Sequence, residues 1–277
     1  MVIVAIYFLL CFSISVYAMA SHLGAASQVL VLLMGLAILP LQKFIHKRPI
    51  ADLGFRRCAW KEVLRAVALP LFIVGAIAVL DLLLGTARIE SFVTLKIPNS
   101  FGMSVTSLSG LTVFILLTFA VLFLLEFVTE ELMFRGYLLG SLDALGDLKG
   151  LLLSSATFGL WHLPIAAWMI GLDPVRTPVY LVNMTVLGLI IGLLFLESNS
   201  LIPAVLFHAL WNALEYSLFG FADQQRMFVG TTRVFFDPEE GIVGTIVLLF
   251  CAYFLLAARR KVRGGERTLQ QSVTPRE

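Results

Sequence analysis

Residues 111–142 read LTVFILLTFAVLFLLEFVTEELMFRGYLLGSL, an apolar run long enough to span a membrane that nevertheless contains ionisable side chains. Four ionisable residues lie inside this run, in a stretch of ten positions: Glu126, Glu130, Glu131 and Arg135. An ionised side chain at the centre of a bilayer costs about 2.5–3.5 kcal/mol on insertion scales, so four of them facing lipid would cost on the order of 10 kcal/mol. We therefore expect them to face protein or a water-filled cavity, which makes them candidates for a functional site.

The composition indicates an all-α polytopic membrane protein. Of the 277 residues, 59% are hydrophobic and only 14% are charged, and the mean hydropathy is +0.94. An ordinary globular protein carries about 25% charged residues. The small net charge of +2 gives no reason to expect a nucleic-acid partner. Cys11, Cys58 and Cys251 are too far apart in the sequence to suggest a CxxC metal site or a disulfide framework, so we predict that they are free.

Apolar runs long enough to cross about 30 Å of hydrocarbon predict about eight transmembrane helices that enclose an active-site cavity. The predicted spans are near residues 2–20, 26–44, 66–86, 108–130 with an extension towards 142, 150–170, 177–197, 200–219 and 241–258. Residues 1–263 form a single transmembrane domain in this interpretation, and residues 264–277 form a disordered cytoplasmic tail. No linker, internal repeat or low-complexity region divides the chain.

The basic residues predict the orientation. Lysine and arginine are concentrated in the connector 43–65 and in the segment after residue 258, so the positive-inside rule places both, and both chain termini, in the cytoplasm. The connector, which includes Leu53-Gly-Phe-Arg-Arg, is expected to lie along the membrane surface. Ala18-Met19-Ala20 matches a signal-peptidase site, but no basic region precedes the apolar run. Retention of residues 1–20 as a first span is therefore favoured over cleavage.

Three predicted helices bring polar side chains to a common depth. Counted at 1.5 Å per residue from the cytoplasmic helix ends, Glu130, His162 and Asn212 lie about 18 Å deep and His208 about 12 Å. Helical spacing also places the two adjacent glutamates, Glu130 and Glu131, on different faces of their helix. Glu131 and Arg135 are four residues apart and can form an ion pair, whereas Glu130 lies about 100° away, on the face of Glu126.

Helix 200–219 also has a polar face. His208 and Asn212 are four residues apart, and Glu215 follows on the same side. Hydrogen-bond donors in such an arrangement can stabilise an oxyanion, and the imidazole can also bind a metal. Glu126 and Glu215 have no clear role beyond support of this group. Trp211 and Asn183 are predicted to make packing contacts.

Three motifs give a specific resemblance: TEELMFRGYLLG at 129–140, SSATFGLWHLP at 154–164 and LIPAVLFHALWN at 201–212. They resemble the motifs of the CPBP family, also called the ABI family, of intramembrane proteases. This family includes the type II CAAX prenyl proteases and bacterial bacteriocin-processing or immunity proteins. The motif-bearing resemblance covers residues 108–219, and the Leu53 to Arg57 segment resembles a weaker family feature. A bacterial inner-membrane location is the expectation that accompanies it.

The resemblance implies a role for each motif residue. Glu130 and His162 would activate water for attack on a peptide carbonyl, His208 and Asn212 would stabilise the oxyanion, and Glu131 and Arg135 would support the site. The substrate would be a membrane-anchored or lipidated protein or peptide. The family has been described both as glutamate proteases and as metalloproteases, so either no cofactor or one divalent metal such as zinc is compatible. Glu130, His162 and His208 would be its ligands, although their spacing is not HExxH.

Other interpretations use the same residues differently. A non-catalytic scaffold or partner-binding protein could keep the buried cluster for structural reasons, since polar residues often join transmembrane helices. A proton-coupled transporter could use Glu126, Glu130, His162 and Glu215 as a relay, although the sequence shows no repeats or paired interrupted helices. The joint occurrence of Glu130, His162, His208 and Asn212 favours the protease.

Overall fold

The computed structural model describes residues 1–23, 25–90, 93–96, 102–105, 107–220, 226–230 and 232–273. Within these ranges, six helical segments are long and apolar enough to cross a membrane. They are Val2–Ala20, Trp60–Leu84, Leu108–Leu125, Asp147–Ile170, Arg176–Ser198 and Ile242–Arg260. The all-α polytopic architecture is therefore confirmed, while the count of eight spans stays a prediction. Helices also occupy the other two predicted spans, at Ala25–Pro40 and Leu201–Leu218.

The helices follow the predicted runs with shifted ends. The α-helices are α1 (Val2–Ala20), α2 (Ala25–Pro40), α3 (Trp60–Leu84), α4 (Leu108–Glu126), α5 (Asp147–Trp161), α6 (Arg176–Ser198), α7 (Leu201–Leu218), α8 (Arg233–Phe236) and α9 (Ile242–Val273). Segments of other helix types extend or connect them. The π-helices are η1 (Leu41–Ile45), η3 (Phe127–Leu139) and η5 (Ile165–Ile170), and the 3₁₀-helices are η2 (Ile50–Leu53) and η4 (Asp143–Leu145). Helix α9 continues to Val273, past residue 264, where the sequence predicts the start of a disordered tail.

Two short antiparallel strand pairs close one end of the bundle and were not predicted. Strand β1 (Ala87–Ile89) pairs with β4 (Phe228–Gly230), and β2 (Val93–Lys96) pairs with β3 (Gly102–Val105). The β-branched residues of these segments suit extended pairing. A search for membrane-length runs cannot reveal strands of three or four residues.

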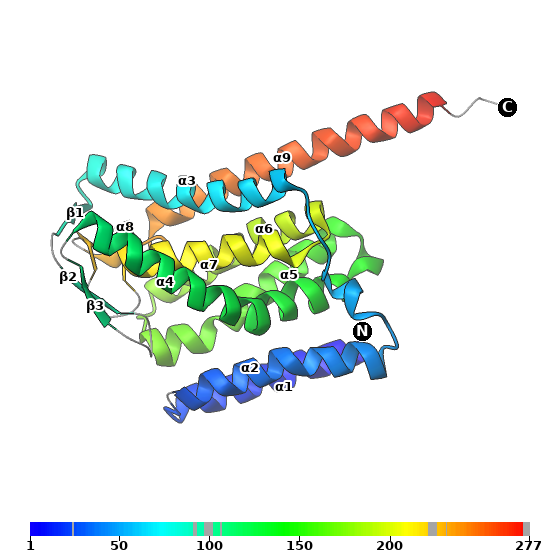
Figure 1. The fold of residues 1–277 in the computed structure, drawn as a ribbon, viewed down its shortest axis with the longest axis horizontal. Coiled ribbons are helices and arrows are strands. Elements are labelled where there is room, and N and C mark those ends of the chain that lie inside the picture. Colours follow the sequence, from blue (N-terminus) through cyan, green and yellow to red (C-terminus); the bar gives the residue numbers. More distant parts are fainter. Residues whose placement is uncertain are drawn as a thin grey trace.

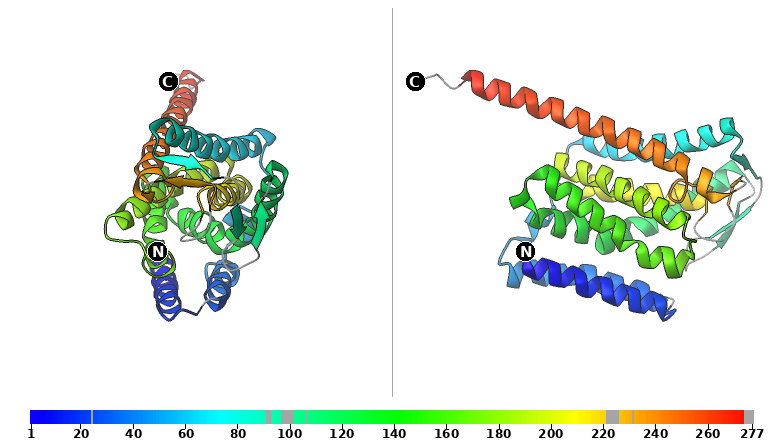
Figure 2. Two further views of the ribbon diagram at one scale, coloured as in Figure 1. Left: turned by 90° about the vertical axis from the view of Figure 1, so that its left-hand side faces the viewer. Right: turned by 180° about the vertical axis from the view of Figure 1, so that it is seen from behind.

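The long helices lie roughly along one direction, with the α1–α2 hairpin on one side of the bundle and α3 and α9 on the opposite side (Figures 1 and 2). Helices α4 to α7 lie between them. The strands are at one end of the bundle, and the connector 41–59, the start of α1 and the C-terminal end of α9 are at the other (Figure 1). The basic segments of the sequence thus gather at one end of the molecule. This gathering is the charge asymmetry that the orientation prediction requires.

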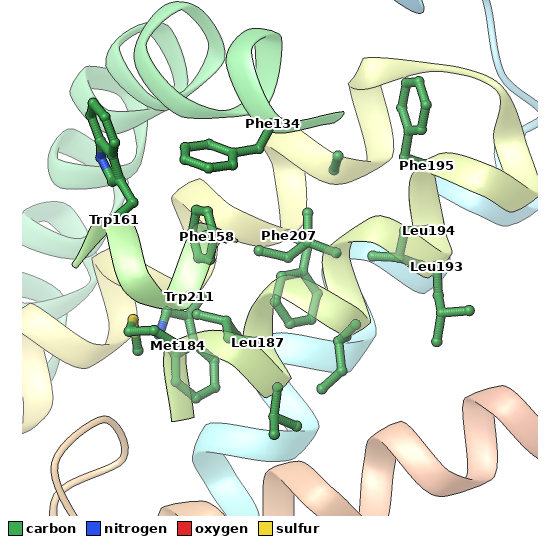
Figure 3. Close-up of a cluster of buried hydrophobic side chains, with 14 of the residues drawn as sticks. Phe134, Phe158, Trp161, Met184, Leu187, Leu193, Leu194, Phe195, Phe207 and Trp211 are labelled. Carbon is green, nitrogen blue, oxygen red and sulfur yellow. The ribbon is translucent and has the colours of Figure 1, made fainter. Parts of the chain in front are cut away.

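Aromatic side chains fill the space between the central helices. Phe134 of η3 contacts Phe158 of α5 edge-on with ring centroids 5.0 Å apart, and Phe207 stacks on Trp211 within α7 (Figure 3). These side chains, together with Leu187 of α6, are at most 1% exposed. They form the apolar wall against which the polar residues of the site are placed.

Helices α5 and α6 pack closely because a glycine lies between them. A Cβ added to Gly159 would come within 2.8 Å of the Leu181 carbonyl oxygen and would collide with the Thr185 side chain. Small residues at such contacts allow transmembrane helix backbones to approach each other. Gly159 is therefore a packing requirement of the pair that carries His162.

We expect Gly159→Ala to destabilise the protein by about 1–3 kcal/mol, because α5 and α6 must move apart. Gly75→Ala in α3 is the matched control, since a Cβ there would meet nothing within 4 Å. That control should be neutral or slightly stabilising, because alanine favours the helix. Unfolding of both variants in detergent measures the difference, and equal stability would contradict the close-packing argument.

Candidate active site

The acidic motif lies on a π-helix. Helix α4 passes into η3, where the backbone hydrogen bonds join residue i to i+5 across Phe127–Leu139. The predicted angle of about 100° between Glu130 and Glu131 holds for an α-helix and is therefore too large here. A π-helical backbone is rare in proteins, and where it occurs it is often at a functional site. The wider turn still places Glu131 and Arg135 side by side. The side chain of Glu126 lies outside the described residues.

Glu131 is the fixed centre of the polar cluster. Its Oε1 accepts from Arg135 Nη1 at 2.9 Å and from His208 Nδ1 at 2.7 Å, and the residue is fully buried. The ion pair expected from the sequence is therefore present, and it extends to a histidine from another helix. Arg135 also donates to the Gly188 carbonyl oxygen at 3.2 Å and lies 4.3 Å from the Phe158 ring centroid. Charge-assisted bonds of this kind orient the His208 ring.

Glu130 and His162 approach the same place from η3 and α5. Glu130 Oε2 lies 4.0 Å from His208 Nε2, and the Glu130 side chain is 14% exposed, more than any other side chain of the cluster. The His162 and His208 rings contact the same Phe158 ring, with centroid distances of 4.6 and 5.8 Å. The structure thus brings together the carboxylate and both imidazoles that the sequence placed at a common depth.

Asn212 completes the group of predicted site residues. It follows His208 by one turn of α7 and is 6% exposed. Helix α7 begins with Ser200, whose Oγ accepts from the Ile202 backbone nitrogen at 3.2 Å. This cap and the tight turn from α6 fix the helix that carries both donors.

The hydrogen bonds of the two histidines define which nitrogen each presents. His162 Nδ1 lies 2.8 Å from the Phe158 carbonyl oxygen, which can only accept a hydrogen bond. His208 Nδ1 lies 2.7 Å from the Glu131 carboxylate, which accepts when ionised. Each Nδ1 therefore carries the proton, and each neutral ring presents Nε2 as a lone pair. Either Nε2 becomes a donor only after it takes up a second proton.

The metal hypothesis gains no geometric support from the described residues. Within that part of the chain, no three or more His, Cys, Asp or Glu side chains are grouped as metal ligands would be. The suggested ligand set of Glu130, His162 and His208 therefore does not form a ready coordination shell in this arrangement. Cys11, Cys58 and Cys251 are free thiols; Cys11 and Cys251 are buried and Cys58 is half-buried.

The contacts that surround the cluster were not predicted from the sequence. Tyr180 of α6 packs edge-on against His162 with ring centroids 5.9 Å apart and is buried. Trp211 was predicted to be a packing residue, but its Nε1 also donates to Glu239 Oε1 at 2.8 Å. Asn183 likewise donates to the Glu239 and Gly241 carbonyl oxygens. The only sequence signal was the unusual density of acids at 237–240, in a loop that carried no motif.

That loop forms a buried acid and arginine network at the strand end of the bundle. Arg233 Nη1 lies 3.1 Å from both Asp237 and Glu240, and Arg176 contacts Glu240 at 3.0 Å. Burial, together with the negative charges of Asp237 and Glu240, raises the pKa of Glu239 from 4.5 to about 8. The hydrogen bond from Trp211 acts in the opposite direction. Glu239 therefore binds a proton in the folded protein over a range in which a free glutamate is ionised.

We expect the raised pKa of Glu239 to make the protein less stable as the pH rises from about 5 to about 8. The folded state holds a proton that the unfolded state has lost above its lower pKa, so the stabilisation disappears as the pH passes through the folded value. Glu239→Gln keeps an acceptor for Trp211 but removes the titration, and should reduce the slope of the melting temperature against pH. Equal slopes for both proteins would contradict this origin of the pH dependence.

The fold and the site together define an integral membrane protein with an acid and histidine cluster buried inside its helix bundle. Residues 112–214 match the family model described as type II CAAX prenyl endopeptidase Rce1-like, which is a model of the CPBP family of proteases. The matched range contains all six predicted site residues. A comparison with curated proteins gave no match.

Proposed function

We propose that this protein is an intramembrane endopeptidase in which Glu130 and the imidazoles activate a water molecule. The observation that carries the proposal is the position of Glu130. Its Oε2 is buried 4.0 Å from His208 Nε2, while Glu131 fixes the opposite nitrogen of that ring. A carboxylate beside a ring held in one orientation, in a side chain that is 14% exposed, is the arrangement that general-base catalysis needs. The match to a protease family supports the same chemistry.

Water held by Glu130 and an imidazole Nε2 would attack the peptide carbonyl carbon. The base takes the water proton as the new carbon–oxygen bond forms, and the carbonyl π electrons move onto oxygen. Asn212 supplies amide donors to this oxyanion from α7. Collapse of the intermediate breaks the carbon–nitrogen bond, and the proton held by the enzyme passes to the leaving amine. Atoms and charge balance without a further reactant.

The tautomers refine the role of His208. The family resemblance assigns it to oxyanion stabilisation, but neutral His208 presents a lone pair at Nε2 because Nδ1 donates to Glu131. We therefore propose that His208 stabilises the oxyanion as an imidazolium, after it has taken up a proton. The adjacent Glu131 carboxylate favours this charged form through its direct hydrogen bond.

The proposed substrate is a membrane-anchored or lipidated protein or peptide, either of the CAAX type or a peptide precursor. Support comes from the location of the site among helices of spanning length and from the family match. A lipid anchor holds the scissile bond at the membrane, which raises its effective concentration at the site. Prenylated and unprenylated versions of one peptide discriminate between the two substrate types.

The direct test incubates the purified, detergent-solubilised protein with a quenched peptide library that contains lipidated and unlipidated members. Cleavage with a preference for lipidated peptides supports the proposal, and a parallel reaction with a chelator determines whether a metal is needed. Absence of cleavage of every member by protein with intact helical content and cooperative unfolding would favour a non-catalytic scaffold. Solute flux or proton current in liposomes would favour a transporter.

A further inference from the structure

A polar pocket of about 260 Å³ is lined in part by the connector 41–59. This connector lies at the end of the bundle opposite the strands (Figure 1). Three parts of the chain line it: the connector, the end of η3 with the turn that follows, and the link between α6 and α7. The lining residues that matter here are Arg48, Asp52, Arg56, Gly140, Asp143 and Asn199. No residue proposed for catalysis lines this pocket.

The connector is held firmly against the bundle at this pocket. The Leu201 backbone nitrogen donates to the Gly54 carbonyl oxygen at 3.0 Å, and Ser200 Oγ donates to the Arg56 carbonyl oxygen at 2.6 Å. Gly54 has a φ of 92°, which a side chain would strain, and Gly136 lets the Leu53 carbonyl oxygen approach η3 closely. The connector therefore forms one wall of the pocket, to which Asp52, Leu53, Gly54 and Arg56 contribute.

The pocket presents both signs of charge. Arg56 Nη2 lies 3.4 Å from Asp52 Oδ1, and both side chains remain about half exposed and accessible to a ligand. Asp143 and Arg48 both line the pocket. Partial burial and the Asp147 charge raise the pKa of Asp143, and the Arg48 charge lowers it. Two guanidiniums and two carboxylates match a ligand that carries an anionic and a cationic group. Guanidinium groups bind phosphate with paired hydrogen bonds, and carboxylates accept hydrogen bonds from a primary ammonium.

The place of the pocket in the fold indicates the source of such a ligand. The surrounding connector contains Lys43, Lys47 and Arg57, and this basic end of the bundle is the end predicted to lie at the cytoplasmic membrane surface. Lipid headgroups occupy that level, and basic pockets at helix ends bind them. We propose that the pocket binds the headgroup of phosphatidylethanolamine, with the phosphate on Arg48 and Arg56 and the ammonium on Asp52 and Asp143.

The lining should favour phosphatidylethanolamine over two other phospholipids. Phosphatidylglycerol has a phosphate but no cation for the two carboxylates. Phosphatidylcholine has a positive charge, but its trimethylammonium group has no N–H to donate. Phosphatidylethanolamine should therefore bind most tightly, independently of any peptidase activity.

Native mass spectrometry of the full chain in detergent, titrated with each of the three lipids, tests the proposal. We expect phosphatidylethanolamine to bind about tenfold more tightly than the other two, the effect of one charge-assisted hydrogen bond. Arg48→Ala should weaken its binding by a similar factor. Arg57→Ala, which removes the same charge from an exposed residue outside the pocket lining, should change it less than twofold.

Two further variants distinguish a loss of lipid binding from a loss of folding. Gly140→Leu fills the pocket, and a Cβ at Gly140 meets nothing within 4 Å, so the fold has room for it. It should abolish the lipid preference while the melting temperature in lipid-free detergent stays unchanged. Asp143→Asn should remove the preference over phosphatidylcholine. Equal affinity for the three lipids, tighter binding of phosphatidylglycerol, or equal losses in Arg48→Ala and Arg57→Ala would overturn the proposal.

Discussion

Glu130→Gln should lower the rate of peptide cleavage by roughly 10²- to 10⁴-fold, the contribution typical of a positioned general base. The amide has nearly the same shape as the carboxylate but cannot take a proton from water. The Glu130 side chain is 14% exposed, and glutamine adds no charge at this position. Protein stability should therefore change little. Initial rates on a cleaved peptide, measured beside a thermal melt, give both quantities.

A matched control separates catalysis from a general loss of acidic charge. Glu90→Gln makes the same chemical change at an exposed glutamate near the strand end of the bundle, and should retain the wild-type rate. If Glu130→Gln also retains it, Glu130 is not the base and the proposed mechanism is wrong. If both variants lose activity together, the loss does not report on the site.

The sequence was sufficient to predict the parts of this protein that follow from local patterns. Apolar runs gave the helices, and the positions of Glu130, His162 and His208 along them predicted their convergence, because a helix converts residue number into depth. The Glu131 and Arg135 pair followed from spacing alone. Each of these inferences needs only one helix geometry and the thickness of a bilayer.

Other features depend on contacts between distant segments and could not be predicted in this way. The π-helical backbone of η3, at Phe127–Leu139, has no marker in the residue types, so an α-helix was predicted there. The partner of Trp211 comes from a loop 28 residues further along the chain. The tautomers of His162 and His208 became defined only when the atoms next to each Nδ1 were known.

Arg135→Leu should destabilise the protein by about 3–5 kcal/mol, the cost of removing one partner from a buried ion pair. Leucine fits an apolar site beside Phe158, but the buried Glu131 then loses its neutralising charge. Arg135 is 1% exposed and Glu131 is fully buried, so water cannot replace the lost partner. Unfolding in a detergent titration, compared with wild type, measures the loss.

The double variant Glu131→Leu/Arg135→Leu distinguishes charge compensation from packing. If the cost of Arg135→Leu comes from the stranded carboxylate, removal of that carboxylate as well should recover part of the stability, because an apolar replacement of a whole buried pair is often neutral. A double variant that is less stable by the sum of the two single losses would instead indicate independent packing contributions. Recovery of stability should not restore cleavage, because His208 would lose the acceptor on Nδ1 that fixes its ring and directs Nε2 towards Glu130. The double variant would then regain stability but not cleavage activity. That separation is expected if Glu131 contributes to catalysis by orienting His208 and Arg135 makes its buried charge tolerable.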